Sequence, residues 1–152
     1  MSMETVFISA CLLGMTCRYD GQSKPLPPKT LAALTARYHL VPVCPEIYGG
    51  LPTPRRPAER QGGCVVTECG EDVTAAYEAG AAQTLELARL LGCKLAILKE
   101  NSPSCGAGAI YDGTFSRTLT SGDGVTAALL QANGIRVVGE SSIEALLVLY
   151  GS

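Results

Sequence analysis

The 152-residue sequence has almost no excess charge and a single histidine. Its formal net charge is −2, and charged residues make up 17% of the chain. A nucleic-acid-binding protein should carry a basic excess or patch, and the nearest approach to one is the small group Arg55, Arg56 and Arg60. We therefore expect no nucleic-acid partner. The one histidine, His39, precedes a predicted strand and is expected at the surface.

Long apolar runs are also missing. No apolar stretch reaches the length needed to cross a bilayer, and the N-terminal segment MSMETVFISACLLG lacks the basic region of a signal peptide. These features predict a cytoplasmic protein with no membrane partner. Apolar residues nevertheless make up 47% of the chain, which is enough for a sizeable core. Without repeats or a visible boundary, residues 1–152 are expected to form a single domain.

Seven cysteines are present, but no two of them form a CxxC pair. They stand at positions 11, 17, 44, 64, 69, 93 and 105. The missing spacing excludes a zinc ribbon and a thioredoxin-type redox motif. In a reducing cytosol, an odd number of cysteines favours metal binding or catalysis over a disulfide framework.

Apolar patterns predict strands and helices in alternation. The expected strands are Thr5–Ser9, Leu40–Val43, Val65–Thr67, Leu95–Leu98 and Ile135–Val138. The expected helices are Pro28–Tyr38, about Val73 to Leu91 with Asp72 and Gly92 as caps, Asp123 or Gly124 to Asn133, and Ser141 or Ser142 through Tyr150. Such alternation is typical of βαβ units with helices on both faces of a parallel sheet. The fold class is predicted to be α/β, a three-layer Rossmann-like domain.

Two segments are predicted to be irregular. The stretch Tyr48–Gly63 is rich in glycine, proline and arginine and is long for a plain connection, so we interpret it as an ordered functional loop. Residues 110–120 are expected to form a loop or a small hairpin.

Three cysteines follow the carboxyl ends of three predicted strands. Cys11 closes the first strand, Cys44 the second, and Cys105 lies in the loop after Leu95–Leu98. Right-handed crossovers place these ends on one edge of a parallel sheet, where ligands bind. Thiolates gathered there would repel one another without a cation, and a bound metal removes their protons outright. The placement predicts a metal centre, most simply an iron–sulfur cluster.

The other cysteines do not share this placement. Free cysteines are often small buried hydrophobes, and we favour that interpretation for Cys64, Cys69 and Cys93. Cys17 follows the turn at Gly14 and could swing back to the site, which makes it a candidate fourth thiol.

Polar residues accompany the three cysteines. Glu46 lies two positions after Cys44, and a carboxylate beside a metal-bound substrate can act as general base on water. The alternative is that Glu46 pairs with Arg55. Ser102 and Ser104 lie just before Cys105 and could belong to the site or merely cap the loop.

Three separate segments, in this order, resemble the small bacterial DUF523 family, which is associated with thiouracil desulfidase. They are SACLLGMTCRYDG (Ser9–Gly21), VCPEIYGGLPTPRRPAE (Val43–Glu59) and KENSPSCGAG (Lys99–Gly108). The resemblance extends to about Val138. It implies a [4Fe-4S] cluster bound by three cysteines only, and these match Cys11, Cys44 and Cys105. It also implies catalytic roles for a glutamate and a serine, which match Glu46 and Ser102.

The activity that the resemblance implies is non-redox desulfuration of a thiolated pyrimidine such as thiouracil. Three protein ligands would leave one iron open as a Lewis acid for the thiocarbonyl sulfur. Glu46 would deprotonate a water held by Ser102, and C=S would become C=O by hydrolysis. The residues expected to contact the pyrimidine are Tyr48, Lys99, Asn101 and Ser104, with Arg55 as a candidate for holding an anionic form.

Two other functions remain open from the sequence. In a non-catalytic iron–sulfur carrier or sensor, Cys17 would complete a set of four cysteine ligands. A mononuclear zinc hydrolase could use the same thiols.

Overall fold

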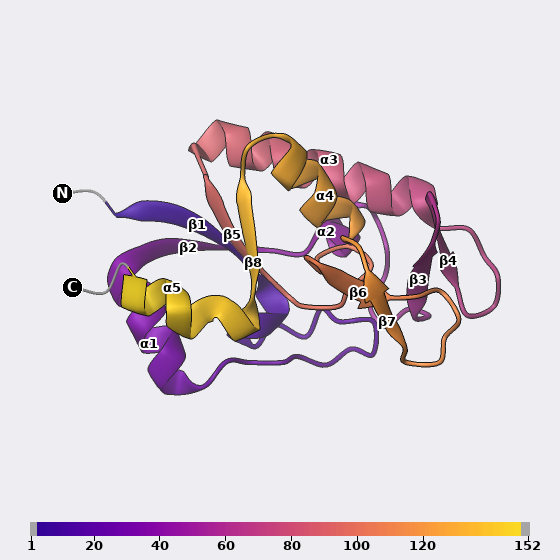
Figure 1. The fold of residues 1–152 in the computed structure, drawn as a ribbon, viewed down its shortest axis with the longest axis horizontal. Coiled ribbons are helices and arrows are strands. Elements are labelled where there is room, and N and C mark those ends of the chain that lie inside the picture. Colours follow the sequence, from indigo (N-terminus) through magenta and orange to yellow (C-terminus); the bar gives the residue numbers. More distant parts are fainter. Residues whose placement is uncertain (1–2, 150–152) are drawn as a thin grey trace.

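A four-stranded parallel sheet forms the centre of the computed structural model, which describes residues 3–149 (Figure 1). Its strands are β1 (Glu4–Ser9), β2 (Tyr38–Val43), β5 (Leu95–Leu98) and β8 (Arg136–Gly139). Their order in space is β2-β1-β5-β8, and every neighbouring pair is parallel. The strands are rich in Val, Ile and Leu, as expected for strands that helices cover on both faces. Their carboxyl ends therefore share one edge.

Helices cover both faces of this sheet (Figure 1). The helices α3 (Thr74–Leu91) and α4 (Val125–Ala132) lie on one face, and α1 (Pro28–Arg37) and α5 (Ile143–Leu149) lie on the other. Three short helices complete the set: η1 (Ala10–Leu13), α2 (Pro45–Tyr48) and η2 (Glu140–Ser142). The predicted three-layer α/β fold is confirmed.

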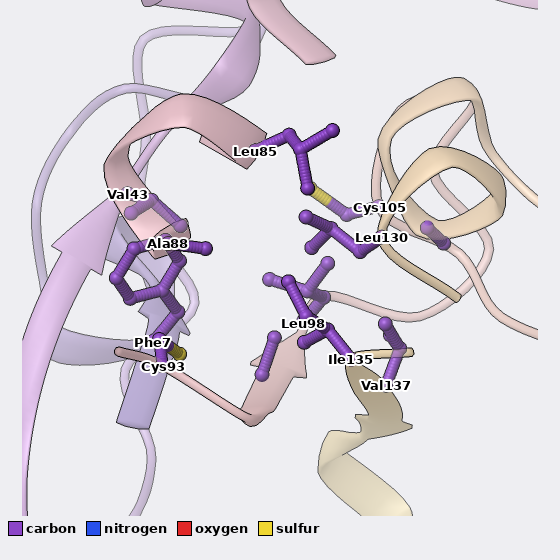
Figure 2. Close-up of a cluster of buried hydrophobic side chains, with 12 residues drawn as sticks. Phe7, Val43, Leu85, Ala88, Cys93, Leu98, Cys105, Leu130, Ile135 and Val137 are labelled. Carbon is purple, nitrogen blue, oxygen red and sulfur yellow. The ribbon is translucent and has the colours of Figure 1, made fainter. Parts of the chain in front are cut away.

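The core consists of two apolar clusters, one on each face of the sheet. Successive residues of a strand point to opposite faces, so Phe7 packs with Leu85 of α3 and Leu130 of α4 in one cluster (Figure 2). Its neighbours in β1, Val6 and Ile8, belong to the other cluster.

Two antiparallel hairpins lie outside the central sheet. One joins β3 (Ala58–Gln61) to β4 (Cys64–Thr67), and the other joins β6 (Ala109–Tyr111) to β7 (Leu119–Ser121). The second confirms the hairpin alternative for residues 110–120. The first corrects the expectation that residues 48–63 form one ordered functional loop, because part of this segment is the strand β3. Because β3 has the polar sequence AERQ, it lacks the apolar alternation that predicts a strand, and backbone pairing across the turn at Gly62-Gly63 forms it instead.

Several predicted boundaries are wrong by one or a few residues. Tyr38 belongs to β2 rather than to the preceding helix, because its backbone is extended at φ −130° and ψ 151°. The N-cap of α3 is Val73, and Asp72 instead accepts a hydrogen bond from the backbone N–H of Thr74. The serines expected to cap the last helix lie in η2, so α5 begins at Ile143.

Other local predictions are confirmed. Gly92 ends α3 in the left-handed region at φ 66°, a conformation that glycine adopts without a steric penalty. Gly124 is the N-cap of α4, and His39 is exposed. The predicted last helix residue, Tyr150, lies outside the described residues. Within residues 3–149, no helix combines the length and apolarity needed to cross a membrane.

Candidate metal centre and active site

A cavity of about 690 Å³ opens at the carboxyl edge of the sheet. Cys11 enters it from η1 after β1, Cys44 from the residue between β2 and α2, and Cys105 from the loop after β5. The topology thus brings the three predicted cysteines to one cavity, although 94 positions separate the first from the last (105 − 11). Cys17 also lines it, as expected for a chain segment that turns back at Gly14.

Burial keeps two of these thiols neutral when no cation is bound. Cys11 and Cys105 are 7% and 5% exposed, and each belongs to a different apolar cluster. Burial raises the pKa of Cys11 to about 11 and also raises the pKa of Cys105. The charge that Cys44 would carry as a thiolate raises both values further. A bound cation would reverse this preference, because metal coordination deprotonates thiols.

Cys17 and Cys44 form a close pair within the cavity wall. A hydrogen bond between the two thiols lowers the pKa of Cys17 and raises that of Cys44. The Sγ atom of Cys44 also lies 3.9 Å from the carbonyl oxygen of Cys17. The pair shows that Cys17 reaches the neighbourhood of a predicted ligand.

The thiols of the cavity are the ligand type that iron–sulfur clusters use. Among residues 3–149, no three His, Cys, Asp or Glu side chains form a group tight enough for one metal ion. The three cysteines come from three separate segments of the chain that line one cavity. In a cubane cluster each thiolate binds a different iron, so the donors lie farther apart than around zinc. The donor set therefore fits a [4Fe-4S] cluster.

Glu46 projects into the same cavity and is held from one side. Arg55 contacts its Oε2 atom twice, from Nη2 at 2.7 Å and from Nε at 3.2 Å. The hydroxyl of Tyr77 donates to the same oxygen at 3.3 Å. In the described part of the chain, no side chain or backbone group donates to Oε1. One carboxylate oxygen is thus anchored, and the other is available to a ligand.

The position of Glu46 depends on close packing between α2 and α3. Pro45 starts α2 at the first helical position, which suits its fixed φ. Gly80 of α3 lies directly against the carbonyl oxygen of Pro45, and Gly49 lies against that of Ala76. A Cβ atom at either glycine would overlap these oxygens. Only glycine therefore lets the segment with Cys44 and Glu46 approach α3 this closely.

Ser102 lines the cavity and also caps its own loop. Its Oγ accepts hydrogen bonds from the backbone N–H groups of Ser104, at 3.0 Å, and Cys105, at 3.1 Å. A hydroxyl has two lone pairs and one proton, so Ser102 retains only its proton for a ligand. The prediction that Ser102 caps its loop is confirmed. The two accepted bonds leave its hydroxyl able to act toward a ligand only as a hydrogen-bond donor.

Lys99 and Asn101 line the cavity as well. The Nζ atom of Lys99 lies 2.6 Å from Oε2 of Glu140, which follows β8 at the same sheet edge. Asn101 adopts φ 68°, a left-handed conformation that asparagine tolerates better than most residues. Both side chains are placed where a ligand could meet them.

Two predicted substrate contacts are not brought to the cavity. Ser104 is fully buried, and its hydroxyl bonds that of Thr126 at 2.8 Å. Tyr48 packs against the apolar cluster of α3 and α4, and its hydroxyl donates to the carbonyl of Pro42. The motif placed these residues near the ligands in sequence, but the turns of the loop and of α2 direct them away.

The remaining cysteines lie apart from the three predicted ligands. Cys93 is 2% exposed, and its thiol donates to the carbonyl of Leu95 at 3.1 Å, as expected for a small buried side chain. Cys64 and Cys69 are exposed, so the expectation that they are buried hydrophobes is wrong. The β3–β4 hairpin and the turn after it present them to solvent.

Comparison with known proteins identifies the family. Residues 6–142 match the family model described as 2-thiouracil desulfurase. This chain belongs to that family. The uncharacterized protein YbbK of Bacillus subtilis (strain 168) is 44% identical over 152 residues, which cover 93% of this chain and 99% of that protein. The solved structure of the [4Fe-4S]-dependent thiouracil desulfidase TudS (DUF523Vcz) is 49% identical, with a TM-score of 0.91 over 97% of this chain and 98% of that one.

Within this family fold, the structure adds residues that the sequence analysis missed. Tyr77 belonged to the apolar face of a predicted helix, and nothing in its spacing signalled a bond to Glu46. Glu59, Phe115 and Arg117 line the cavity from the two hairpins. Glu59 is the last residue of the segment Val43–Glu59, which resembles the family. That position was the one sequence feature that could have marked Glu59 as a site residue.

Proposed function

We propose that this protein is an iron–sulfur-dependent desulfidase that hydrolyses the C=S group of thiolated pyrimidines such as thiouracil to C=O. The single observation that carries the proposal is the convergence of Cys11, Cys44 and Cys105 on one cavity that also holds the half-anchored carboxylate of Glu46. Membership of the 2-thiouracil desulfurase family supports the substrate class. The 49% identity to a [4Fe-4S]-dependent thiouracil desulfidase supports the cofactor.

The three cysteines would hold the [4Fe-4S] cluster. With only three protein ligands, such a cluster keeps one iron open, which supplies a thiophilic Lewis acid to the thiocarbonyl group. The cavity of about 690 Å³ is large enough for both a cluster and a small heterocycle.

Glu46 would act as the general base. Arg55 and Tyr77 hold its Oε2 atom and thereby fix the plane of the carboxylate. Oε1 then points toward a ligand with little freedom to turn away. A base that is already oriented can take a proton from water at the moment when the water attacks carbon.

Ser102 would orient that water as a hydrogen-bond donor. Because two backbone N–H groups occupy its lone pairs, its hydroxyl can donate to the water oxygen but cannot accept the water's proton. The proton therefore goes to Glu46. Overall, one H₂O is consumed and one H₂S is released, so carbon exchanges sulfur for oxygen and no electron is transferred.

The proposal is tested by anaerobic reconstitution with iron and sulfide, followed by incubation with 2-thiouracil. We expect uracil and sulfide in equal amounts. Glu46→Ala should keep the cluster's visible absorption and lose turnover by about a hundredfold or more, the usual contribution of a general base. Glu86→Ala, an exposed carboxylate on α3, is the control and should retain activity. A loaded cluster that yields neither sulfide nor uracil would overturn the proposal.

The pairing of Cys17 with Cys44 favours a second candidate, an iron–sulfur carrier or sensor with four cysteine ligands. In that case Cys17→Ser should lose iron, and the wild-type protein should show no desulfidase turnover. If three cysteines suffice, Cys17→Ser should keep both its iron and its activity.

A further inference from the structure

The chain has only two phenylalanines, and they occupy opposite kinds of environment. Phe7 is fully buried in the core. Phe115 lies in the loop between β6 and β7, is half-buried, and lines the cavity that holds the three cysteines. This apolar ring therefore stands outside the two core clusters, on the wall of the cavity.

The backbone that carries this ring is held in a rarely populated conformation. Phe115 has φ 58° and Arg117 has φ 59°, both in the left-handed region that bulky L-residues seldom adopt. Such conformations persist only where the surroundings impose them, and they concentrate at functional sites. The question is therefore what holds this loop in place.

Glu59 of the neighbouring hairpin holds it. This carboxylate is 9% exposed, and its Oε1 atom accepts hydrogen bonds from the backbone N–H groups of Gly113, at 2.9 Å, and Phe115, at 3.1 Å. Gln61 Nε2 adds a bond to the carbonyl of Gly113 at 2.8 Å. A Cβ atom at Gly113 would lie only 2.8 Å from the carbonyl oxygen of Arg60, so glycine is needed for this close approach.

Three other aromatic residues line the cavity, and two of them are already engaged elsewhere. Tyr77 is buried, and its hydroxyl is bound to Glu46. Tyr19 is 41% exposed and lies under the guanidinium of Arg18, 5.8 Å from the ring centroid. The third, Tyr111, belongs to β6 of the same hairpin. Phe115 has no polar side-chain group, so it can contact a ligand in the cavity only through its ring.

We propose that Phe115 stacks on the planar ring of the substrate and that Glu59 is the positioning residue that holds it there. This inference rests on the proposed function and names the residue that would recognise the flat ring of its substrates. Stacking of a base on an aromatic side chain contributes to binding without reading hydrogen-bond patterns. An acyclic thioamide could use the cluster and Glu46 but would gain nothing from Phe115.

The kinetic test compares Phe115→Ala with the reconstituted wild-type protein on two substrates. For 2-thiouracil we expect KM to rise about tenfold with kcat nearly unchanged, the pattern for loss of uniform binding. For thioacetamide, KM should not change. Leu119→Ala, an exposed apolar residue of the same hairpin, is the matched control and should behave as wild type. An unchanged KM for 2-thiouracil in Phe115→Ala would overturn the proposal.

A binding test separates this inference from the proposed function. Because the chain contains no tryptophan, Phe115→Trp introduces a single tryptophan at the proposed contact, and its emission can be excited selectively over that of the tyrosines. Titration with uracil should change its emission saturably, whether or not the protein turns over thiouracil. Saturable binding without turnover would refute the desulfidase but keep the ring contact. Emission that does not respond to uracil would refute the ring contact alone.

The role of Glu59 is tested by rescue. Glu59→Ala leaves two buried N–H groups without an acceptor, and we expect the same rise in KM for 2-thiouracil as in Phe115→Ala. Glu59→Gln retains an oxygen acceptor and should restore most of the affinity. If both Glu59 variants lowered only stability and left KM unchanged, the positioning role would be refuted.

Discussion

The guanidinium of Arg55 lies 2.7 Å from Oε2 of Glu46, and the two side chains are only 7% and 14% exposed. Arg55 also donates from Nη2 to the carbonyl oxygen of Cys17 at 3.1 Å. It thus joins α2, the loop after η1 and the proline-rich segment that carries it. The alternative prediction, that Glu46 pairs with Arg55, is confirmed. Its role as general base remains a prediction, which the free Oε1 atom permits.

Replacing Arg55 with alanine should harm stability and activity together. Removing one partner of a largely buried ion pair leaves the other charge unpaired, at a cost on the order of 3 kcal/mol. Arg55→Lys keeps the charge but loses the two-pronged contact, so an intermediate loss is expected. Urea unfolding and desulfidase rate measure the two effects. Arg56→Ala is the control: its pair with Glu68 is exposed and should contribute less than about 0.5 kcal/mol, and a larger effect there would contradict this reasoning.

The cysteines should divide into two groups by iron content. Cys11→Ala, Cys44→Ala and Cys105→Ala each remove a proposed ligand and should bind little iron after reconstitution. Cys93→Ala changes a thiol in the apolar core and should bind as much iron as wild type. Iron and sulfide analysis of the purified variants decides the matter. Full iron binding in any one of the first three variants would remove that residue from the ligand set.

Gly80→Ala should displace the segment that carries Cys44 and Glu46. The added Cβ would overlap the carbonyl oxygen of Pro45, which is backbone and cannot move without shifting α2. Overpacking of this kind costs up to about 3 kcal/mol, and iron binding and turnover should fall with it. Gly63→Ala is the matched control, because nothing lies within 4 Å of a Cβ there. Its unfolding midpoint should equal that of wild type.

Asp72 should contribute to stability in a pH-dependent way. Hydrogen bonds from the side chain and backbone of Thr74 lower the pKa of this carboxyl below its ordinary value of 3.8. The folded state therefore favours the ionised form, and the contribution is complete above pH 3.8 and disappears as the pH falls through the folded-state pKa. Asp72→Ala should lower the urea midpoint at pH 7, and its difference from wild type should shrink at low pH. A difference between Asp72→Ala and wild type that stays the same from pH 7 down to low pH would contradict this reasoning.

Local patterns were sufficient for the main elements and insufficient for the hairpins. The strand Leu95–Leu98 was predicted with its observed bounds, because a short apolar run between turn residues has few alternatives. The strand Ala58–Gln61 was missed, because its pairing with Cys64–Thr67 is a matter of backbone geometry that its polar side chains do not signal. Boundary errors such as Asp72 against Val73 arise because helix ends are defined only to within a residue or two. The Asp72 carboxylate still accepts a hydrogen bond from the N–H of Thr74, the first residue of α3.

Chain-distant contacts could not be predicted in the same way. Tyr77 bonds Glu46 across 31 positions, and Glu59 bonds Gly113 across 54. Each contact requires two elements to pack at one particular distance and angle, and no local pattern records that. The sequence likewise placed Ser104 at the site by its closeness to Cys105, whereas the turn of the loop buries its hydroxyl against Thr126.

The sequence by itself determined that strands and helices alternate, that three cysteines follow strand ends, and that three motifs match one family, because these are properties of residue type and spacing. Only the tertiary structure decided which oxygen of Glu46 is free, which way the Ser102 hydroxyl can donate, and that Phe115 reaches the cavity. Those outcomes depend on how distant backbone segments approach one another. Here that approach is set by glycines in contact with carbonyl oxygens and by buried carboxylates that hold loops from another part of the chain.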